Sequence, residues 1–462
     1  MSGNTERATG VNSDSRAFRA MRLLGLDYHV VATLLLRSWS ILAGGFMIVL
    51  IPWWLTPTEQ GYYYTFASLI ALQVFFELGM NQVIVQLVAH EVAQAERNSN
   101  GAMVRDPIAL ARLISLSRLL GRWYFVTSLL FGLAAGTGGI IFFMTQAGGA
   151  SGMMLLIWIV LVLATAANLY LSPWLAVMEG MGEVGRVARL RLIQSVLGYG
   201  LTILALVSGA RLGAVPALAI IGALCTSYWL SRREPMLRWL RREAATTDAD
   251  ATMLSWRRDI FPLQWRIAVS WISGYFIMQL FVPLTFVHWG AVEAGRLGMS
   301  LSIFNAVLTV GLSWVNTKLP VMSGQIARGE HRPLNTLFFG ALARSMVAVV
   351  LGCIAVVLAY AILPATMRSR LADPSVMALL AVTTMLLCFT SALATYMRAH
   401  KEEPLLAASV TLAALSLAAA VFGSWFGVPV MMALYATILL VVSLPWILRI
   451  FLQYLSRHRP AA

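Results

Sequence analysis

Residues 56–86 read TPTEQGYYYTFASLIALQVFFELGMNQVIVQ, and this stretch decides the fold class. A polar start around Glu59 gives way to an apolar run from Gly61 to Ala89, in which Glu77 is the only charged residue. An α-helix needs about 20 mainly apolar residues to cross a bilayer once. The run is therefore predicted to be a membrane-spanning helix.

The rest of the chain has the same character. Of its 462 residues, 59% are hydrophobic and 12% are charged, and the mean hydropathy is +0.76. This composition excludes a water-soluble globule. The cysteines Cys225, Cys353 and Cys388 lie inside apolar runs, so we expect small buried side chains and neither disulfides nor a metal site.

Further apolar runs of crossing length follow along the whole chain, for about twelve in total. Their ranges are 29–55, 61–89, 113–146, 152–177, 190–210, 212–230, 260–288, 295–320, 337–364, 376–397, 405–425 and 428–454. The predicted fold is all-α, with two six-helix bundles in the membrane.

One long polar interruption divides these runs into two equal sets. We therefore predict a cytoplasmic N-terminal segment (1–28), an N-terminal six-helix bundle (29–230), a cytoplasmic linker (231–259), a C-terminal six-helix bundle (260–455) and a cytoplasmic tail (456–462). An even number of crossings in each set places both termini on the same side of the membrane.

The basic residues indicate which side that is. Lys and Arg number 34 against 20 Asp and Glu, for a net charge of +14. The span map places roughly twenty-five of the basic residues on the side of the termini, which favours cytoplasmic termini. The opposite side receives Arg211, Arg296, Arg368 and Arg370. Topology and contact with anionic lipids account for the positive charge, and no nucleic-acid partner is expected.

A short internal repeat supports two related halves. Glu59-Gln60-Gly61 is followed by Ser68, and Glu293-Ala294-Gly295 is followed at the same distance by Ser302. Both motifs lie at the outer turn before an even-numbered span. Halves with an even helix count are expected to be parallel repeats, with a cleft between them.

The same stretch carries a family resemblance. Residues 56–86 resemble the first-repeat signature of the polysaccharide-export family, the Wzx-type flippases of the multidrug/oligosaccharidyl-lipid/polysaccharide superfamily. Residues 179–195, EGMGEVGRVARLRLIQS, resemble the turn between that family's fourth and fifth helices. Many relatives place an acid late in the seventh helix, where this chain reads Gln279-Leu280-Phe281.

The resemblance implies a V-shaped, MATE-like pair of bundles in the bacterial inner membrane. Such a protein would flip an undecaprenyl-diphosphate-linked oligosaccharide for O-antigen, capsule or exopolysaccharide synthesis, without a cofactor. Implied partners are the lipid-linked oligosaccharide, membrane lipids, and the polysaccharide polymerase and chain-length machinery.

A diphosphate inside the membrane requires a wet, cationic cavity, because unpaired polar groups are costly in hydrocarbon. Arg37 in the first span and Arg266 in the seventh are the first candidates, since the guanidinium fork suits a diphosphate. The alternative for both is a structural arginine that reaches the membrane surface. That alternative is favoured for Lys318 and Arg344.

Polar residues form two further stripes. Gln73, Glu77 and Asn81 recur every four residues. They form either a cavity wall, with Glu77 paired to Arg37 or protonated during transport, or static contacts between helices. In the eighth span, Asn305, Thr309 and Asn316 share a face with Ser302 and Ser313, and this face is predicted to line the cavity.

Aromatic residues at span ends, including Tyr62, Tyr63 and Tyr64, are predicted to form an interfacial belt. No catalytic motif is found, so enzyme activity is not expected. The alternative function is a MATE-type antiporter that exchanges cationic drugs for H⁺ or Na⁺. A membrane glycan polymerase is disfavoured because the outer loops are short.

Overall fold

The computed structural model describes residues 28–98, 107–146, 149, 151–232, 260–400 and 405–457. Almost all of the predicted N-terminal segment and linker, and most of the predicted tail, lie outside these ranges. Within them the chain is helical and contains no strand, which confirms the predicted all-α class.

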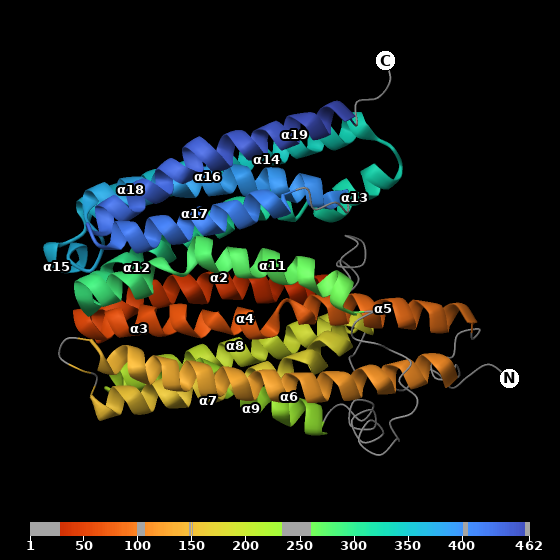
Figure 1. Ribbon diagram of the computed structural model, residues 1–462, viewed down its shortest axis with the longest axis horizontal. Helices are drawn as coiled ribbons and strands as arrows, with labels where there is room; N and C mark the ends of the chain where they lie inside the picture. Colours follow the sequence, from red (N-terminus) through yellow and green to blue (C-terminus); the bar gives the residue numbers. More distant parts are fainter. Residues whose placement is uncertain are drawn as a thin grey trace, which may run out of the picture.

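The described part of the first half supplies six crossings, five single helices and one bent pair, and is drawn in red to yellow-green in Figure 1. They are formed by α2 (Tyr28–Trp54), α3 (Pro57–Ile70), η1 (Ala71–Gln73), α4 (Val74–Glu77), α5 (Met80–Asn98), α6 (Pro107–Met144), α7 (Gly152–Gly180), α8 (Val184–Val207), η2 (Arg211–Ala214) and α9 (Ala217–Arg232). Elements α3 to α5 together make the second crossing.

This second crossing is broken, whereas the sequence predicted a continuous helix. It begins with a capping box, in which Thr56 Oγ1 accepts from the Glu59 N–H at 3.2 Å and the Glu59 carboxylate accepts from the Thr56 N–H at 2.8 Å. At Leu78 and Gly79 the backbone turns left-handed, with φ of 50° and 67°, and the two parts meet at 43°. A positive φ at leucine is strained, so the surrounding packing must hold the break.

The second half of the chain is drawn in green to blue in Figure 1. It contains α11 (Phe261–Met278), α12 (Phe281–Asn316), α13 (Leu319–Ala327), α14 (His331–Ile362), α15 (Ala365–Arg368), α16 (Pro374–Ala399), α17 (Leu406–Ser424), α18 (Val428–Ile438), the π-helical η4 (Leu439–Ser443) and α19 (Leu444–Arg457).

Helix α12 consists of two helices joined at Gly290, whose φ of 81° and ψ of 178° are not helical. The apolar stretch that contains it, Gln264–Ala327, has 64 residues. As one helix it would be about 96 Å long, roughly three times the hydrocarbon thickness, so it crosses twice. In the described ranges ten helices are long and apolar enough to cross, the bent second crossing adds one, and the reversal at Gly290 adds another. The result agrees with the twelve predicted spans.

The two ends of the molecule differ in how closely the halves approach. The distal end, as we name it, carries the start of α3 and α15; the proximal end carries α13 and the end of α19 (Figure 1). The reversal at Gly290 belongs to the distal end, because the next residue, Ala291, lies against Gly61 of α3. The core of the first half also includes Val282, Phe286 and Ala294 from the second half. Two further cores contain residues of the second half only. The described helices therefore form two bundles, and residues of both halves share one of the three cores.

Candidate functional site

A cavity of about 420 Å³ lies between the two halves. Its walls come from α2, α3 and α8 of the first half and from α12 of the second. The polar and aromatic lining residues are Ser40, Tyr63, Tyr64, Tyr199, Ser302, Asn305 and Thr309. We call this space the central cavity.

Helical spacing explains which side chains reach this cavity. Ser302, Asn305 and Thr309 follow one another at intervals of three and four on α12, so they share one face. On α2, Gly44 and Gly45 also line the cavity, and a Cβ at either position would meet nothing within 4 Å. The missing side chains therefore leave room between the halves.

The cavity wall offers hydrogen bonds but no charge. The hydroxyls of Ser40, Ser302 and Thr309 donate to carbonyls of their own helices at 2.8–2.9 Å, which leaves their oxygens as acceptors. The Asn305 amide forms no hydrogen bond to another described residue, so both its donors and its acceptor are available. None of the lining residues is Asp, Glu, Lys or Arg.

Two glycines of the internal repeat close the cavity at the distal end. A Cβ at Gly61 would overlap the carbonyl of Ala291, and one at Gly295 would lie 2.8 Å from the Gly61 nitrogen. A Cβ at Gly298 would overlap Tyr64. The predicted repeat therefore marks the point where α3 and α12 cross, and only glycine permits so close an approach.

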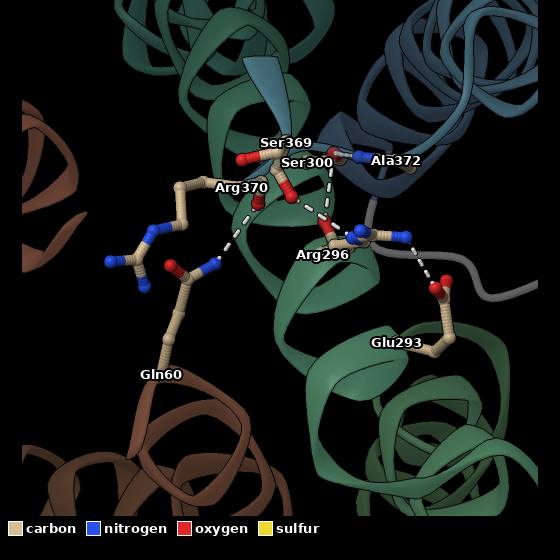
Figure 2. Close-up of polar contacts among 7 residues, drawn as sticks. All are labelled: Gln60, Glu293, Arg296, Ser300, Ser369, Arg370 and Ala372. Carbon is tan, nitrogen blue, oxygen red and sulfur yellow. Dashed lines mark hydrogen bonds and ion pairs between the residues drawn. The ribbon is translucent and has the colours of Figure 1, made fainter. Parts of the chain in front are cut away.

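Gln60 fastens this crossing (Figure 2). Its side chain is 1% exposed, and its Nε2 donates to the carbonyls of Gly295 at 2.9 Å and Arg370 at 3.0 Å. The amide thus joins α3 of the first half to two segments of the second half. We call this set of hydrogen bonds the Gln60 latch.

The residues around the latch are tied to the second half. Arg296 donates to the Ser369 carbonyl at 2.9 Å and pairs with Glu293, while the Ala372 N–H donates to Ser300 Oγ at 3.0 Å (Figure 2). Two buried atoms, Gln60 Oε1 and Arg370 Nη1, have no hydrogen-bond partner among the described residues. Unpaired polar atoms raise the free energy of the closed state, which favours a contact that can open.

The distal end also collects the arginines that the span map assigned to one side. Arg211 lies 3.8 Å from the Glu59 carboxylate, and Arg296, Arg368 and Arg370 lie in or beside the α12–α15 contact. Burial lowers the pKa of the Arg370 guanidinium, and the nearby Glu59 carboxylate opposes that shift. The four arginines that the span map assigned to one side therefore lie at the same end of the molecule.

The predicted diphosphate ligands do not line the central cavity. Arg37 lies one turn of α2 from Ser40, toward the proximal end, and is exposed. Arg266 is also exposed, with its guanidinium 5.6 Å from the centre of the Trp265 ring. Neither forms an ion pair with a described acid, so both guanidinium groups are free to meet an anion.

The other predicted site residues are distributed more widely. Asn305 and Thr309 lie in the cavity wall. Asn316, the last residue of α12, is exposed outside it, and Lys318 lies in the short turn before α13. Arg344 is exposed on α14, and Gln73 is half-buried in η1.

Glu77 and Asn81 belong to a network inside the first half. Asn81 Nδ2 donates to Glu77 Oε1 at 2.7 Å, and Tyr124 OH donates to Asn81 Oδ1 at 2.9 Å. Ser172 Oγ donates to the same oxygen at 3.4 Å. The helix break at Leu78 and Gly79 disrupts the predicted regular stripe, and Glu77 does not pair with Arg37.

The predicted interfacial belt of tyrosines is wrong for Tyr62, Tyr63 and Tyr64. Tyr62 and Tyr64 are 7% and 6% exposed, and Tyr63 and Tyr64 line the cavity. Tyr62 instead packs among Phe66, Phe143 and Phe286. The closeness of α3 and α12 turns this run inward. Tyr199 was also missed, although a polar aromatic in an apolar span could have flagged it.

The described residues contain no group of three or more His, Cys, Asp or Glu side chains that could hold a metal ion. Cys225, Cys353 and Cys388 are free thiols. These observations leave the central cavity as the site on which a function can be argued.

Comparison with known proteins identifies the fold. No family model and no curated protein matches the sequence. The solved inward-facing conformation of a multidrug resistance MATE family transporter of the MOP superfamily is 13% identical, with a TM-score of 0.52 over 88% of this chain and 98% of that chain. The lipid II flippase MurJ, in an inward closed conformation, is 12% identical, with a TM-score of 0.57 over 91% of this chain and 86% of that chain. The chain therefore has the fold of these two solved structures.

Proposed function

We propose that this protein is a flippase of the Wzx type, which carries a polyprenyl-diphosphate-linked oligosaccharide across the bacterial inner membrane. The product would serve the synthesis of a surface polysaccharide such as O-antigen, capsule or exopolysaccharide. The observation that carries the proposal is the uncharged, hydroxyl- and tyrosine-lined central cavity between the two halves.

The lining suits a saccharide better than a cationic drug. Sugar hydroxyls need both donors and acceptors when they leave water, and Asn305, Ser302 and Thr309 supply them. The rings of Tyr63 and Tyr199 add apolar faces with a polar edge, against which a pyranose can pack. A cation would find no carboxylate in this wall, and its desolvation would go uncompensated.

The diphosphate is assigned to the arginines outside the cavity. Arg37 lies one turn to the proximal side of Ser40, so a glycan in the cavity would place its anionic end toward that turn. Arg266 is the second candidate. A guanidinium group that is exposed and forms no ion pair with a described acidic side chain can pair in bidentate fashion with phosphate oxygens.

The proposal includes the cellular setting that this substrate requires. Both termini and the linker would be cytoplasmic, and the distal end would face outward, as the distribution of basic residues favours. The polysaccharide polymerase and the chain-length machinery would then take the product on the outer side.

The test uses purified protein in vesicles that contain a polyprenyl-diphosphate-linked oligosaccharide in the inner leaflet. We expect the protein to expose the glycan to an added lectin. Asn305→Val should slow exposure at least tenfold, because one buried sugar hydroxyl group loses its partner. Thr137→Val is the matched control, since Thr137 is exposed on α6 and bonds only to its own helix.

The same vesicles separate this proposal from the antiporter. They can be loaded with a cationic dye and given an H⁺ or Na⁺ gradient. Gradient-driven dye efflux without glycan exposure would overturn the flippase proposal and favour the MATE-type function.

A further inference from the structure

A second cavity, of about 280 Å³, lies inside the first half. Its walls come from α2, α3, α7, α8 and α9, so it belongs to a single bundle. Met47, Tyr63, Ala67 and Tyr199 line both this space and the central cavity. The two spaces therefore meet at that wall, and we call the second one the side pocket.

The side pocket is apolar beyond the shared wall. Ile70, Leu161 and Leu218 supply aliphatic surface. Thr165 and Thr202 also line it, but each hydroxyl donates to a carbonyl of its own helix at 2.8 Å. No charged residue is among the lining residues. The central cavity, in contrast, offers free hydrogen-bonding groups.

An apolar space of this kind is suited to a hydrocarbon ligand. Its lining loses dispersion contacts while the space is empty, and an apolar cavity holds water poorly but binds apolar molecules. At about 30 Å³ for each water-sized group, it holds roughly nine such groups. That volume matches a branched hydrocarbon segment of about ten carbons.

We propose that the side pocket is a binding subsite for a short hydrocarbon group of the transported molecule, attached directly to the polar part that occupies the central cavity. This inference rests on the proposed function. Tyr63 and Tyr199 lie at the boundary, where their amphipathic rings face apolar carbon on one side and polar groups on the other. The hydrocarbon has two candidate sources. An apolar substituent on the glycan agrees with a diphosphate held outside the cavity at Arg37, whereas isoprenoid units in the pocket would place the diphosphate itself in the central cavity.

The test measures the binding of short probes to the full-length protein in lipid nanodiscs. The probes are geranyl diphosphate, with ten carbons, and dimethylallyl diphosphate, with five. We expect Ala219→Leu, which places a larger side chain in the pocket, to weaken geranyl diphosphate binding at least tenfold and to leave the five-carbon probe unchanged. The control is Ala134→Leu, because Ala134 is exposed on α6 outside the pocket.

A second variant changes the pocket in the opposite direction, so that the test does not depend on a loss of binding alone. Leu218→Ala enlarges the pocket and should strengthen binding of fifteen-carbon farnesyl diphosphate relative to the ten-carbon probe. A folded Ala219→Leu protein still binds the five-carbon probe, which distinguishes a filled pocket from a collapsed one. Equal effects on all chain lengths would overturn the subsite. So would the absence of binding, or of any effect of Ala219→Leu, for both these probes and the acylated sugar described next.

A further probe identifies the source of the hydrocarbon. A monosaccharide esterified with an eight-carbon acyl chain presents the same apolar group without a diphosphate. Sensitivity of this probe alone to Ala219→Leu assigns the pocket to a glycan substituent, and sensitivity of geranyl diphosphate assigns it to the carrier. If vesicles expose no glycan while chain-length selectivity persists, the proposed function fails and the subsite stands.

Discussion

At the residue scale, charge and hydrogen bonding are separated in space. The central cavity holds uncharged groups such as Asn305, while Arg37 and Arg266 lie outside it. A substrate with an anionic end and a neutral, hydroxyl-rich end matches this separation. The two arginines can therefore be tested apart from the cavity wall.

Replacing Arg37 or Arg266 by Gln should weaken binding of a polyprenyl-diphosphate saccharide about tenfold or more, because a charge-assisted hydrogen bond contributes about 1.5–3 kcal/mol. Lys should restore only part of the loss, since it lacks the bidentate fork. The control is Arg122→Gln, an exposed arginine on α6. Binding titrations in nanodiscs check this, and unchanged affinity in a Gln variant would assign that arginine to structure.

At the element scale, the broken second crossing determines how the halves meet. Gly79 adopts a φ of 67°, and a Cβ there would overlap the Ile267 side chain of α11. The break therefore lies against the other half of the molecule. The half-helix ends that such breaks expose are common features of transporter sites.

Gly79→Ala should lower the free energy of unfolding by about 1–3 kcal/mol, because alanine is strained at this φ and its Cβ meets Ile267. The measurement is the melting temperature of the detergent-solubilised protein, which should fall. Gly138→Ala is the matched control. Gly138 is helical and has nothing within 4 Å of its Cβ position, so alanine should be neutral or stabilising by up to about 1 kcal/mol. A Gly79→Ala protein as stable as the parent would show that the break is not held by this contact.

Sequence patterns predicted the elements better than their interruptions. The spans follow from local hydropathy, because the bilayer acts on each run of about 20 residues separately. The break at Leu78 and Gly79 depends on distant packing, and a single glycine inside an apolar run does not by itself predict it. Likewise, Asn305 and Thr309 reached the cavity wall as their spacing predicted, whereas Tyr63 and Tyr64 turn inward only because α3 and α12 cross closely.

At the scale of the whole molecule, the distal end is closed by contacts between the halves. The proposed function requires that end to open, and opening must break the Gln60 latch. The latch consists of two hydrogen bonds from Gln60 Nε2 to the carbonyls of Gly295 and Arg370, and the same nitrogen makes a longer contact with Met299 Sδ at 3.5 Å. Its strength therefore sets part of the balance between the closed and open states.

Gln60→Leu removes both bonds, about 0.5–1.5 kcal/mol each, and should raise the population open at the distal end about tenfold. The readout is the rate at which an impermeant thiol reagent, added from the distal side, labels Ser302→Cys in the cavity. Cys225, Cys353 and Cys388 are first replaced by Ala so that no native thiol reacts.

The matched control for the latch is Gln194→Leu. Gln194 Nε2 also donates two hydrogen bonds, to the Gly222 carbonyl at 3.1 Å and to Thr226, but both partners lie within the first half. This variant should lower stability without faster labelling, because it leaves the contact between the halves intact. Equal labelling rates in the parent and the Gln60→Leu protein would show that the latch does not hold the distal end closed. Faster labelling in both variants would mean that any loss of stability opens the cavity, and the closure would then have to rest on the glycine crossing of Gly61 and Gly295.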